Sequence, residues 1–217
     1  MIDRTVYNFL SAKKYIFWDF DGVIKESVEV KSDAFEQLFK SFGSKVAKKI
    51  RSHHEKNGGI SRFDKLPIYL SWAGQDYSQT MVDMYSEKFS KLVKQNVINS
   101  EWIPGVLDYI QLNLSDQTFF LVTATPQSEI EEIIDTLMLK KYFSRIIGAP
   151  TNKDVAINMI LSEYSIDPNK ALMIGDSNSD YEAALENQVP FVLRRTNLNH
   201  NLQKRITCPM FNNFCDE

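Results

Sequence analysis

Cysteine and histidine are scarce in this sequence. Two of the 217 residues are cysteine and three are histidine. Cys208 and Cys215 both lie near the C-terminal end, so a bond between them could not cross-link a fold of this length. These side chains also do not supply a structural zinc site of the usual spacing. We therefore expect no disulfide framework and a reducing compartment, with the cytoplasm as the default.

Long hydrophobic runs and an excess of positive charge are also absent. No apolar stretch approaches the roughly 20 residues that cross a bilayer. Residues 1–15 carry scattered charges and lack the apolar region of a secretory signal. The 25 basic and 28 acidic residues give a net charge of −3, whereas a nucleic-acid-binding surface is strongly basic. These absences predict a chain with no membrane or nucleic-acid partner, and they leave monomer and homodimer both open.

The composition is that of a globular protein, with 43% hydrophobic and 24% charged residues. Several short apolar runs lack in/out alternation and predict strands of a parallel sheet that is covered on both faces. These runs are Tyr15–Phe20, Phe119–Ala124, Arg145–Ala149, Ala171–Asp176 and Pro190–Arg194. Segments of helical periodicity lie between them, at Ser128–Leu139, Lys153–Glu163 and Asp180–Glu186. This alternation predicts an α/β fold with a doubly wound, Rossmann-like parallel sheet.

Residues 25–103 interrupt the alternation of strands and helices. Helical periodicity appears at Ser32–Phe42 and Ser78–Val93, and no strand pattern is present. Pro104 and Gly105 then form a turn signal where the sheet resumes. We therefore expect an α/β core made of residues 1–24 and 104–217, with an all-helical insertion at 25–103.

Polar side chains follow the ends of four predicted strands. In a parallel sheet these ends meet at one edge, where open α/β sheets bind their ligands. The two-residue period of a strand also places the two acidic residues of the first run on one side. The set comprises four carboxylates, a hydroxyl and an ammonium, namely Asp19, Asp21, Asp176, Asp180, Thr123 and Lys153.

The charges of this set indicate a metal ion. Several carboxylates buried together cost several kcal/mol each unless a positive charge accompanies them. Oxygen ligands without histidine favour Mg²⁺. The charges of Asp19, Asp21 and Asp176 would then balance those of Mg²⁺ and Lys153. A site balanced in this way could accept a phosphoryl dianion, whose transfer depends on positioning and charge stabilisation.

The motifs resemble those of the haloacid dehalogenase superfamily of aspartate-nucleophile phosphotransferases. In order they are DFDGV at Asp19–Val23, Thr123, Lys153, and GDSNSD at Gly175–Asp180. The resemblance covers the chain from Tyr15 to about Phe191, and it is highly specific because all motifs occur in order at predicted strand ends. It implies that the helical insertion is a cap of the family's first class. The relatives it points to are phosphoglycolate phosphatases and β-phosphoglucomutases, which act on small phosphorylated metabolites.

The resemblance also implies a role for each motif residue. Asp19 would be the nucleophile that forms an aspartyl-phosphate, and Asp21 would act as general acid and then general base. Thr123 and Lys153 would hold the phosphoryl oxygens. The ligands of Mg²⁺ would be Asp19, Asp176 and the carbonyl of Asp21, with Asp180 supporting the metal site.

The cap carries a second clue to the substrate. Residues 59–66, GISRFDKL, are similar to the specificity loop of β-phosphoglucomutase-like members, in which the arginine holds a second anionic group. We accordingly expect Arg62 and Lys65 to bind substrate. A solvated helix face is the alternative for both residues, and a helix N-cap is the alternative for Asp180. His53 and His54 cannot share one helical face, and we expect them to be surface or core residues.

The acid at position 21 favours phosphate-ester chemistry over dehalogenation in this family. Lys31 stands where many capped members have histidine, and Gly175 where mutase relatives favour an acid. Both departures favour a phosphatase, possible substrates including sugar phosphates, with a phosphomutase as the alternative. Lys153 is followed by Asp154 where proline is common, which affects only the loop that presents the lysine.

Two further readings of the motifs fit poorly. A serine esterase centred on Ser177 would need a G-x-S-x-G motif, which the sequence lacks, and an acid where Asn197 precedes His200. A phospho-acceptor switch that resembles a response-regulator receiver also gathers acids, threonine and lysine on one sheet. The helical insertion and the chain length argue against it.

Overall fold

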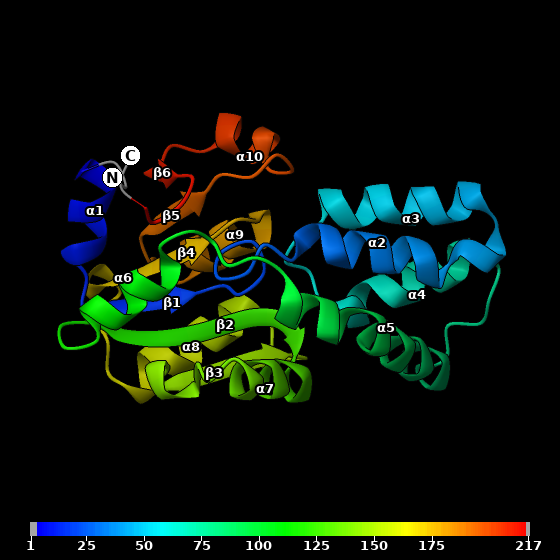
Figure 1. The fold of residues 1–217 in the computed structure, drawn as a ribbon, viewed down its shortest axis with the longest axis horizontal. Helices are drawn as coiled ribbons and strands as arrows, with labels where there is room; N and C mark the ends of the chain where they lie inside the picture. Colours follow the sequence, from blue (N-terminus) through cyan, green and yellow to red (C-terminus); the bar gives the residue numbers. More distant parts are fainter. Residues whose placement is uncertain (1–3, 216–217) are drawn as a thin grey trace.

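The computed structural model describes residues 4–215, with side chains from Val6 onward. Figure 1 shows an α/β core with a helical cap beyond one end of its sheet. The strands are β1 (Tyr15–Trp18), β2 (Thr118–Pro126), β3 (Arg145–Ala149), β4 (Ala171–Gly175), β5 (Phe191–Arg194) and β6 (Met210–Phe211). The helices of the core are α1 (Arg4–Ser11), α6 (Val106–Asn113), α7 (Gln127–Thr136), α8 (Lys153–Glu163), α9 (Asn178–Glu186) and α10 (His200–Arg205). Those of the cap are α2 (Val28–Leu38), α3 (Ser44–Lys56), α4 (Arg62–Trp72) and α5 (Gln79–Asn99). No helix in the range 4–215 combines the length and apolarity that a bilayer crossing requires.

The strands form one parallel sheet in the order β3-β2-β1-β4-β5-β6. β1 lies at its centre, where it pairs with β2 through Trp18 and Leu121 and with β4 through Trp18 and Ile174. The chain order reverses between β2 and β4 around this strand, which is the position where doubly wound sheets bind ligands. The predicted fold class, a parallel sheet with helices and an inserted helical cap, is confirmed.

Alternate side chains of each strand enter two separate cores. In β1, Ile16 and Trp18 pack with α1, α6 and α7, whereas Phe17 packs with α8 and α9 on the other face. Both faces are therefore apolar, which explains why the strands show no polar alternation in the sequence. With both faces covered by helices, the carboxyl-terminal edge of the sheet is left to carry polar side chains.

The helical cap is an insertion that leaves and rejoins the core through adjacent segments. The Glu26 amide donates to the Glu101 carbonyl at 2.8 Å, and the Ile103 amide donates to the Ile24 carbonyl at 3.0 Å. The Lys25 ammonium lies 4.2 Å from the centroid of the Trp102 ring between these bonds. The division of the chain at 24/25 and 103/104 remains a prediction.

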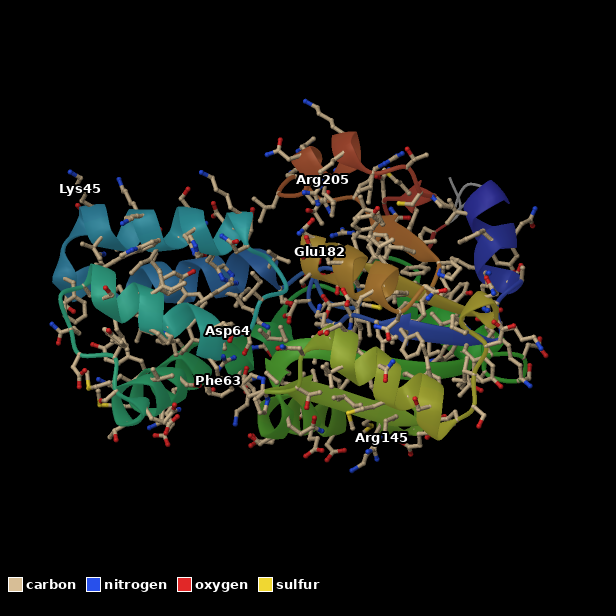
Figure 2. The ribbon with its side chains drawn as sticks, turned by 180° about the vertical axis from the view of Figure 1, so that it is seen from behind. Lys45, Phe63, Asp64, Arg145, Glu182 and Arg205 are labelled. Atoms are coloured by element: carbon tan, nitrogen blue, oxygen red, sulfur yellow. The ribbon has the colours of Figure 1, made fainter. Side chains whose placement is uncertain are left out.

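Aromatic side chains fill the interior of the cap. Phe35 of α2 lies against Phe89 of α5, with ring centroids 4.0 Å apart, and it meets Tyr69 of α4 edge to face. Burying aromatic rings of this size stabilises helices that would be marginal alone. The helices of the cap are thereby fixed relative to one another, and the start of α4 faces the core. Figure 2 shows Phe63 and Asp64 at this junction, far from Lys45 at the outer end of the cap.

Several elements differ from the expectation. The predicted helix at Ser32–Phe42 begins earlier, at Val28, and ends at Leu38 before a 3₁₀ turn. α9 begins at Asn178 rather than at Asp180, because Ser177 is its N-cap. Residues from Arg62 onward form a helix rather than a loop, because the Ser61 hydroxyl accepts a hydrogen bond from the Phe63 amide and caps it. α1, α6, α10 and β6 were not predicted.

Candidate active site

Asp19 directly follows β1 and is held by backbone contacts at the edge of the sheet. Its own amide donates to the Ile174 carbonyl of β4 at 3.0 Å, and its carboxylate accepts from the Phe20 amide at 2.8 Å. The chain then turns at Gly22, which has a φ of +74°. A Cβ at this position would collide with the carboxylate of Asp176. Glycine therefore lets the turn after β1 approach the end of β4 closely.

Three buried carboxylates converge at this edge. One oxygen each of Asp19, Asp176 and Asp180 lies within 4.8 Å of the others. Burial and the neighbouring Asp180 carboxylate raise the pKa of Asp19 to about 7. Burial and the charges of Asp19 and Asp180 raise the pKa of Asp176 well above its ordinary value. The cluster thus disfavours its own anionic form, and a hard divalent cation with oxygen ligands fits it.

Lys153 supplies the positive charge of the cluster from the first turn of α8. Its Nζ lies 2.9 Å from an Asp19 oxygen and 2.5 Å from an Asp180 oxygen. Burial would lower the pKa of this lysine, but the carboxylates of Asp180 and Asp19 outweigh it and raise the pKa. The ammonium therefore stays charged at neutral pH, next to the oxygen of Asp19.

Asp180 takes part in a capping box as well as in the acidic cluster. The Ser177 hydroxyl and amide both donate to its carboxylate, at 2.6 and 3.0 Å, and its own amide donates back to Ser177. Ser177 is thus the N-cap of α9 and Asp180 stands in its first turn. The alternative of Asp180 as the N-cap is wrong. The cap geometry instead directs one oxygen of Asp180 to Lys153.

Asp21 lies outside the cluster and faces the cap. Its carboxylate accepts from the Ser27 hydroxyl at 2.6 Å and from the Thr125 hydroxyl at 3.2 Å, and it forms an ion pair with Lys31 of α2. Burial would raise the pKa of Asp21, but the Lys31 ammonium and these hydrogen bonds outweigh it and lower the pKa. Lys31 also donates to Thr125 at 2.8 Å. The sequence reasoning did not assign Ser27 or Thr125, although the two-residue spacing from Thr123 placed Thr125 on the same side of β2.

The acidic residues open into a cavity of about 70 Å³ between core and cap. Thr123 lines it from the end of β2, with its hydroxyl accepting from the Thr125 amide at 3.2 Å. Among the residues predicted for the site, all but Lys65 and Asp180 line this cavity. The lining residues are Asp19, Asp21, Val28, Lys31, Phe35, His54, Gly58, Gly59, Ile60, Arg62, Phe89, Thr123, Ala124, Lys153 and Asp176.

Arg62 joins the cap to the core through a buried ion pair. Its guanidinium donates to both oxygens of Glu129 in α7, at 2.6 and 2.9 Å, and the two side chains are 4% and 5% exposed. It also donates to the Ser90 hydroxyl at 2.7 Å. Burial would raise the pKa of Glu129, but Arg62 outweighs it and lowers the pKa. The guanidinium faces a protein carboxylate in this arrangement, and binding of substrate by Arg62 remains a prediction.

Lys65 lies one turn further along α4 and is also buried. It is 2% exposed, and its Nζ lies 3.1 Å from Nδ1 of His54 in α3. His54 is a cavity-lining residue that sequence reasoning left as a surface or core histidine. Its position on the helix gave no indication, because two adjacent histidines face different sides of α3. Direct binding of substrate by Lys65 remains a prediction.

The loop before α4 approaches the core at the acidic edge. Gly59 has a φ of +73°, and a Cβ there would collide with the hydroxyls of Ser177 and Ser179. Beside this loop, a second cavity of about 280 Å³ extends past Lys153, lined among others by Ser61, Asp64, Asn152 and Glu182. Figure 2 places Asp64 on the cap and Glu182 on the core.

Comparison with known proteins places this arrangement in a family. The chain matches a phosphoglycolate phosphatase of Pseudomonas aeruginosa with 25% identity over 182 residues, which are 79% of this chain and 65% of that protein. The chain thus spans slightly less than two thirds of that relative. The fold resembles a predicted phosphoglycolate phosphatase from Haemophilus somnus, with a TM-score of 0.73 at 17% identity over 94% of this chain and 95% of that one. It also resembles a protein from Thermotoga maritima provisionally described as a β-phosphoglucomutase, with a TM-score of 0.65 at 20% identity over 91% and 93% of the two chains.

The family itself is defined by a match along most of the chain. Residues 16–193 match the haloacid dehalogenase-like hydrolases, a range that begins in β1 and ends in β5. It includes the three converging carboxylates, Lys153 and the helical cap. The chain therefore belongs to the haloacid dehalogenase-like hydrolase family.

Proposed function

We propose that this protein is a Mg²⁺-dependent phosphatase that hydrolyses a small phosphomonoester through an aspartyl-phosphate on Asp19. The observation that carries the proposal is the convergence of Asp19, Asp176 and Asp180 with the Lys153 ammonium at one edge of the sheet. Membership of a hydrolase family and the names of the phosphatase relatives support it.

Asp19 is the nucleophile of the proposed reaction. One of its oxygens attacks phosphorus as the bond to the leaving oxygen breaks, and water then attacks the aspartyl-phosphate, which releases phosphate and restores the carboxylate. Lys153, 2.9 Å from an Asp19 oxygen, stabilises negative charge on the phosphoryl oxygens, and Thr123 donates to them from β2.

The proposed metal site combines the carboxylate of Asp19 with those of two residues that follow β4. Asp19 and Asp176 would hold Mg²⁺ with the carbonyl of Asp21, and Asp180 would support them. When bound, the ion supplies the positive charge that lets a dianionic phosphoryl group approach a carboxylate. Burial of the three side chains explains why this charge is needed, since buried carboxylates without a counterion are strongly disfavoured.

Asp21 is the proposed acid and base. Its ion pair with Lys31 keeps it deprotonated in the structure described, which suits the second step, in which it takes a proton from water. To protonate the leaving oxygen in the first step, it must give up this ion pair and take up a proton from water. A phosphate ester in the cavity competes for Lys31 and so promotes the release of Asp21.

The leaving group of the substrate is small. The cavity of about 70 Å³ leaves little room beyond a phosphoryl group, and the neighbouring cavity of about 280 Å³ offers space beside Lys153 for a sugar. The phosphatase relatives are named for phosphoglycolate, whose leaving group carries a carboxylate. Phosphoglycolate and sugar phosphates both belong to the class of small phosphorylated metabolites.

The test is phosphate release from a panel of phosphorylated metabolites in the presence of Mg²⁺, repeated with EDTA. We expect multiple turnovers with Mg²⁺, release of one phosphate for each substrate lost, and no release in chelator. Loss of substrate without free phosphate would identify a phosphomutase instead. Full activity in chelator would contradict the metal site.

A further inference from the structure

The Lys65 ammonium is buried without a carboxylate partner. At 2% exposure, its Nζ has no acidic oxygen within 4.0 Å among residues 6–215, and the one hydrogen-bond partner found there is Nδ1 of His54 at 3.1 Å. The other cations near the cavity are paired, Arg62 with Glu129, Lys31 with Asp21, and Lys153 with Asp19 and Asp180. A buried cation lacking a counterion is costly unless an anion arrives to compensate it.

Lys65 fixes the hydrogen-bonding pattern of His54. In its charged form Lys65 can only donate, so Nδ1 of His54 is then the acceptor and the ring hydrogen lies on Nε2. The imidazole packs on Phe35 with ring centroids 4.8 Å apart, which holds its plane. Burial and the neighbouring Lys65 lower the pKa of His54 well below its ordinary value, so the ring is neutral.

The donor on His54 is available to the cavity. His54 lines the cavity together with Asp19, Asp21 and Lys153, and it is 8% exposed. Nε2 of His54 makes no hydrogen bond within residues 6–215. In the same residues, Nε1 of Trp18 is the one side-chain nitrogen or oxygen that is fully buried and also lacks a hydrogen-bond partner. Nε2 of His54 is therefore accessible rather than sealed in the cap. His54 thus places a ring nitrogen without a protein partner on the cap side of the cavity, opposite the acidic residues and Lys153 of the core.

We propose that His54, oriented by Lys65, determines the substrate by donating Nε2–H to an anionic oxygen on the leaving group. This inference rests on the proposed function and deepens it, because it selects a short phosphorylated hydroxy acid over a neutral alcohol or sugar phosphate. His54 contacts the substrate, and Lys65 is a positioning residue that also compensates the charge of the acceptor. The small volume of the cavity favours an acceptor only a few atoms from phosphorus.

The test compares two phosphate esters of equal length, phosphoglycolate and 2-hydroxyethyl phosphate, which differ in the carboxylate alone. Their affinities are measured by calorimetry with Mg²⁺ on the full-length Asp19→Asn variant, so that turnover is not required. We expect phosphoglycolate to bind about tenfold more tightly. Adding His54→Phe, which retains the contact with Phe35, removes this preference and leaves the affinity for 2-hydroxyethyl phosphate within about threefold.

Further variants separate positioning from folding. His54→Gln retains an N–H donor near the position of Nε2 and restores part of the preference. Lys65→Met reduces the preference and Lys65→Arg retains more of it. His53→Phe is the matched control, because His53 contacts Tyr69 and does not line the cavity, and it leaves the preference unchanged. Thermal unfolding checks that each variant is folded.

The outcomes distinguish this inference from the proposed function. Equal affinity of the parent for the two esters, or a preference that survives His54→Phe, overturns the role of His54. Failure of the wild-type protein to release phosphate from any ester overturns the proposed function, whereas the binding preference is measured independently of turnover.

Discussion

Asp19 combines burial, a raised pKa and contact with an ammonium, and these properties have opposite effects on its reactivity. Burial and Asp180 disfavour the charged form of Asp19, whereas the Lys153 ammonium at 2.9 Å favours it. We expect Asp19→Asn to reduce phosphate release by at least about a thousandfold, since a nucleophile has no substitute in a covalent mechanism.

The same substitution leaves the fold intact, because the amide retains the shape and relieves repulsion between carboxylates. Phosphate release and thermal unfolding, measured on the same preparation, check both statements. Turnover within a few-fold of the parent would contradict the assignment of the nucleophile.

Lys65 gives a prediction about stability and pH. Burial and the charges of Lys31 and Lys153 lower its pKa from 10.5 to about 7. Below pH 7 the ammonium is charged in both the folded and the unfolded chain, so folding pays the full cost of burial. Between pH 7 and 10.5 the folded chain binds fewer protons than the unfolded one, and stability rises with pH.

Lys65→Met therefore stabilises the protein, and it does so more at pH 6 than at pH 10. Urea unfolding at the two values measures the difference. Lys45→Met, at an exposed position in the outer part of the cap, is the control and changes stability little. A gain in stability that is the same at pH 6 and at pH 10 would show that burial of the ammonium is not its cause.

The contact between α4 and α7 makes a prediction at the scale of elements. Arg62 and Glu129 form a buried bidentate pair, and removing one partner leaves the other charge without compensation. We expect Glu129→Leu or Arg62→Met alone to lower the free energy of unfolding by about 3–5 kcal/mol.

The double variant Arg62→Met, Glu129→Leu recovers most of this loss, because no buried charge remains. A double-mutant cycle by urea denaturation measures the coupling. Additive losses would mean that the two side chains act independently. The exposed pair Lys94–Glu132, which also joins α5 to α7, serves as a control with little effect.

The elements that sequence reasoning identified are those with a pattern of their own. β1, β2 and β4 were predicted because both faces of the sheet are apolar, and α8 was predicted with its bounds because its periodicity begins at Lys153. β6 is two residues long and α10 is six, too short for a periodic signal. The start of α9 was missed because Ser177 and Asp180 are both good caps, and the hydrogen bonds decide between them.

In the site, local sequence patterns predicted some of the residues, whereas contacts between residues far apart in the sequence determine the others. Asp19, Asp176 and Lys153 follow strands, so their convergence was predicted from the parallel sheet. The pair Arg62–Glu129 joins residues 67 positions apart, and no local pattern records which carboxylate meets the guanidinium. His54 reaches the cavity only because α3 packs beside α2 and α4 in the cap.

For the molecule as a whole, the acidic cluster predicts a link between pH, metal and stability. The pKa of Asp19 rises from 3.8 to about 7 on folding, so between these values the folded chain binds more protons than the unfolded one. Without metal, stability therefore falls as pH rises through this range. In the proposed metal site, Mg²⁺ would bind the deprotonated carboxylates and so reverse the loss.

We expect Mg²⁺ to raise the Tm by several degrees at pH 8 and by little at pH 5, in scanning calorimetry with chelator as reference. Asp176→Asn abolishes most of the increase. A metal effect of equal size at both values would contradict binding by this cluster.

The hydrogen bonds between Glu26 and Glu101 and between Ile24 and Ile103 make the two crossings to the cap a single ribbon. The chain thus enters and leaves the cap at one place, through two segments that are hydrogen-bonded to each other. For protein engineering, this ribbon is a natural junction for chimeras. Exchange of residues 28–99 for the cap of a relative would transplant substrate preference while the phosphoryl chemistry stays with the recipient.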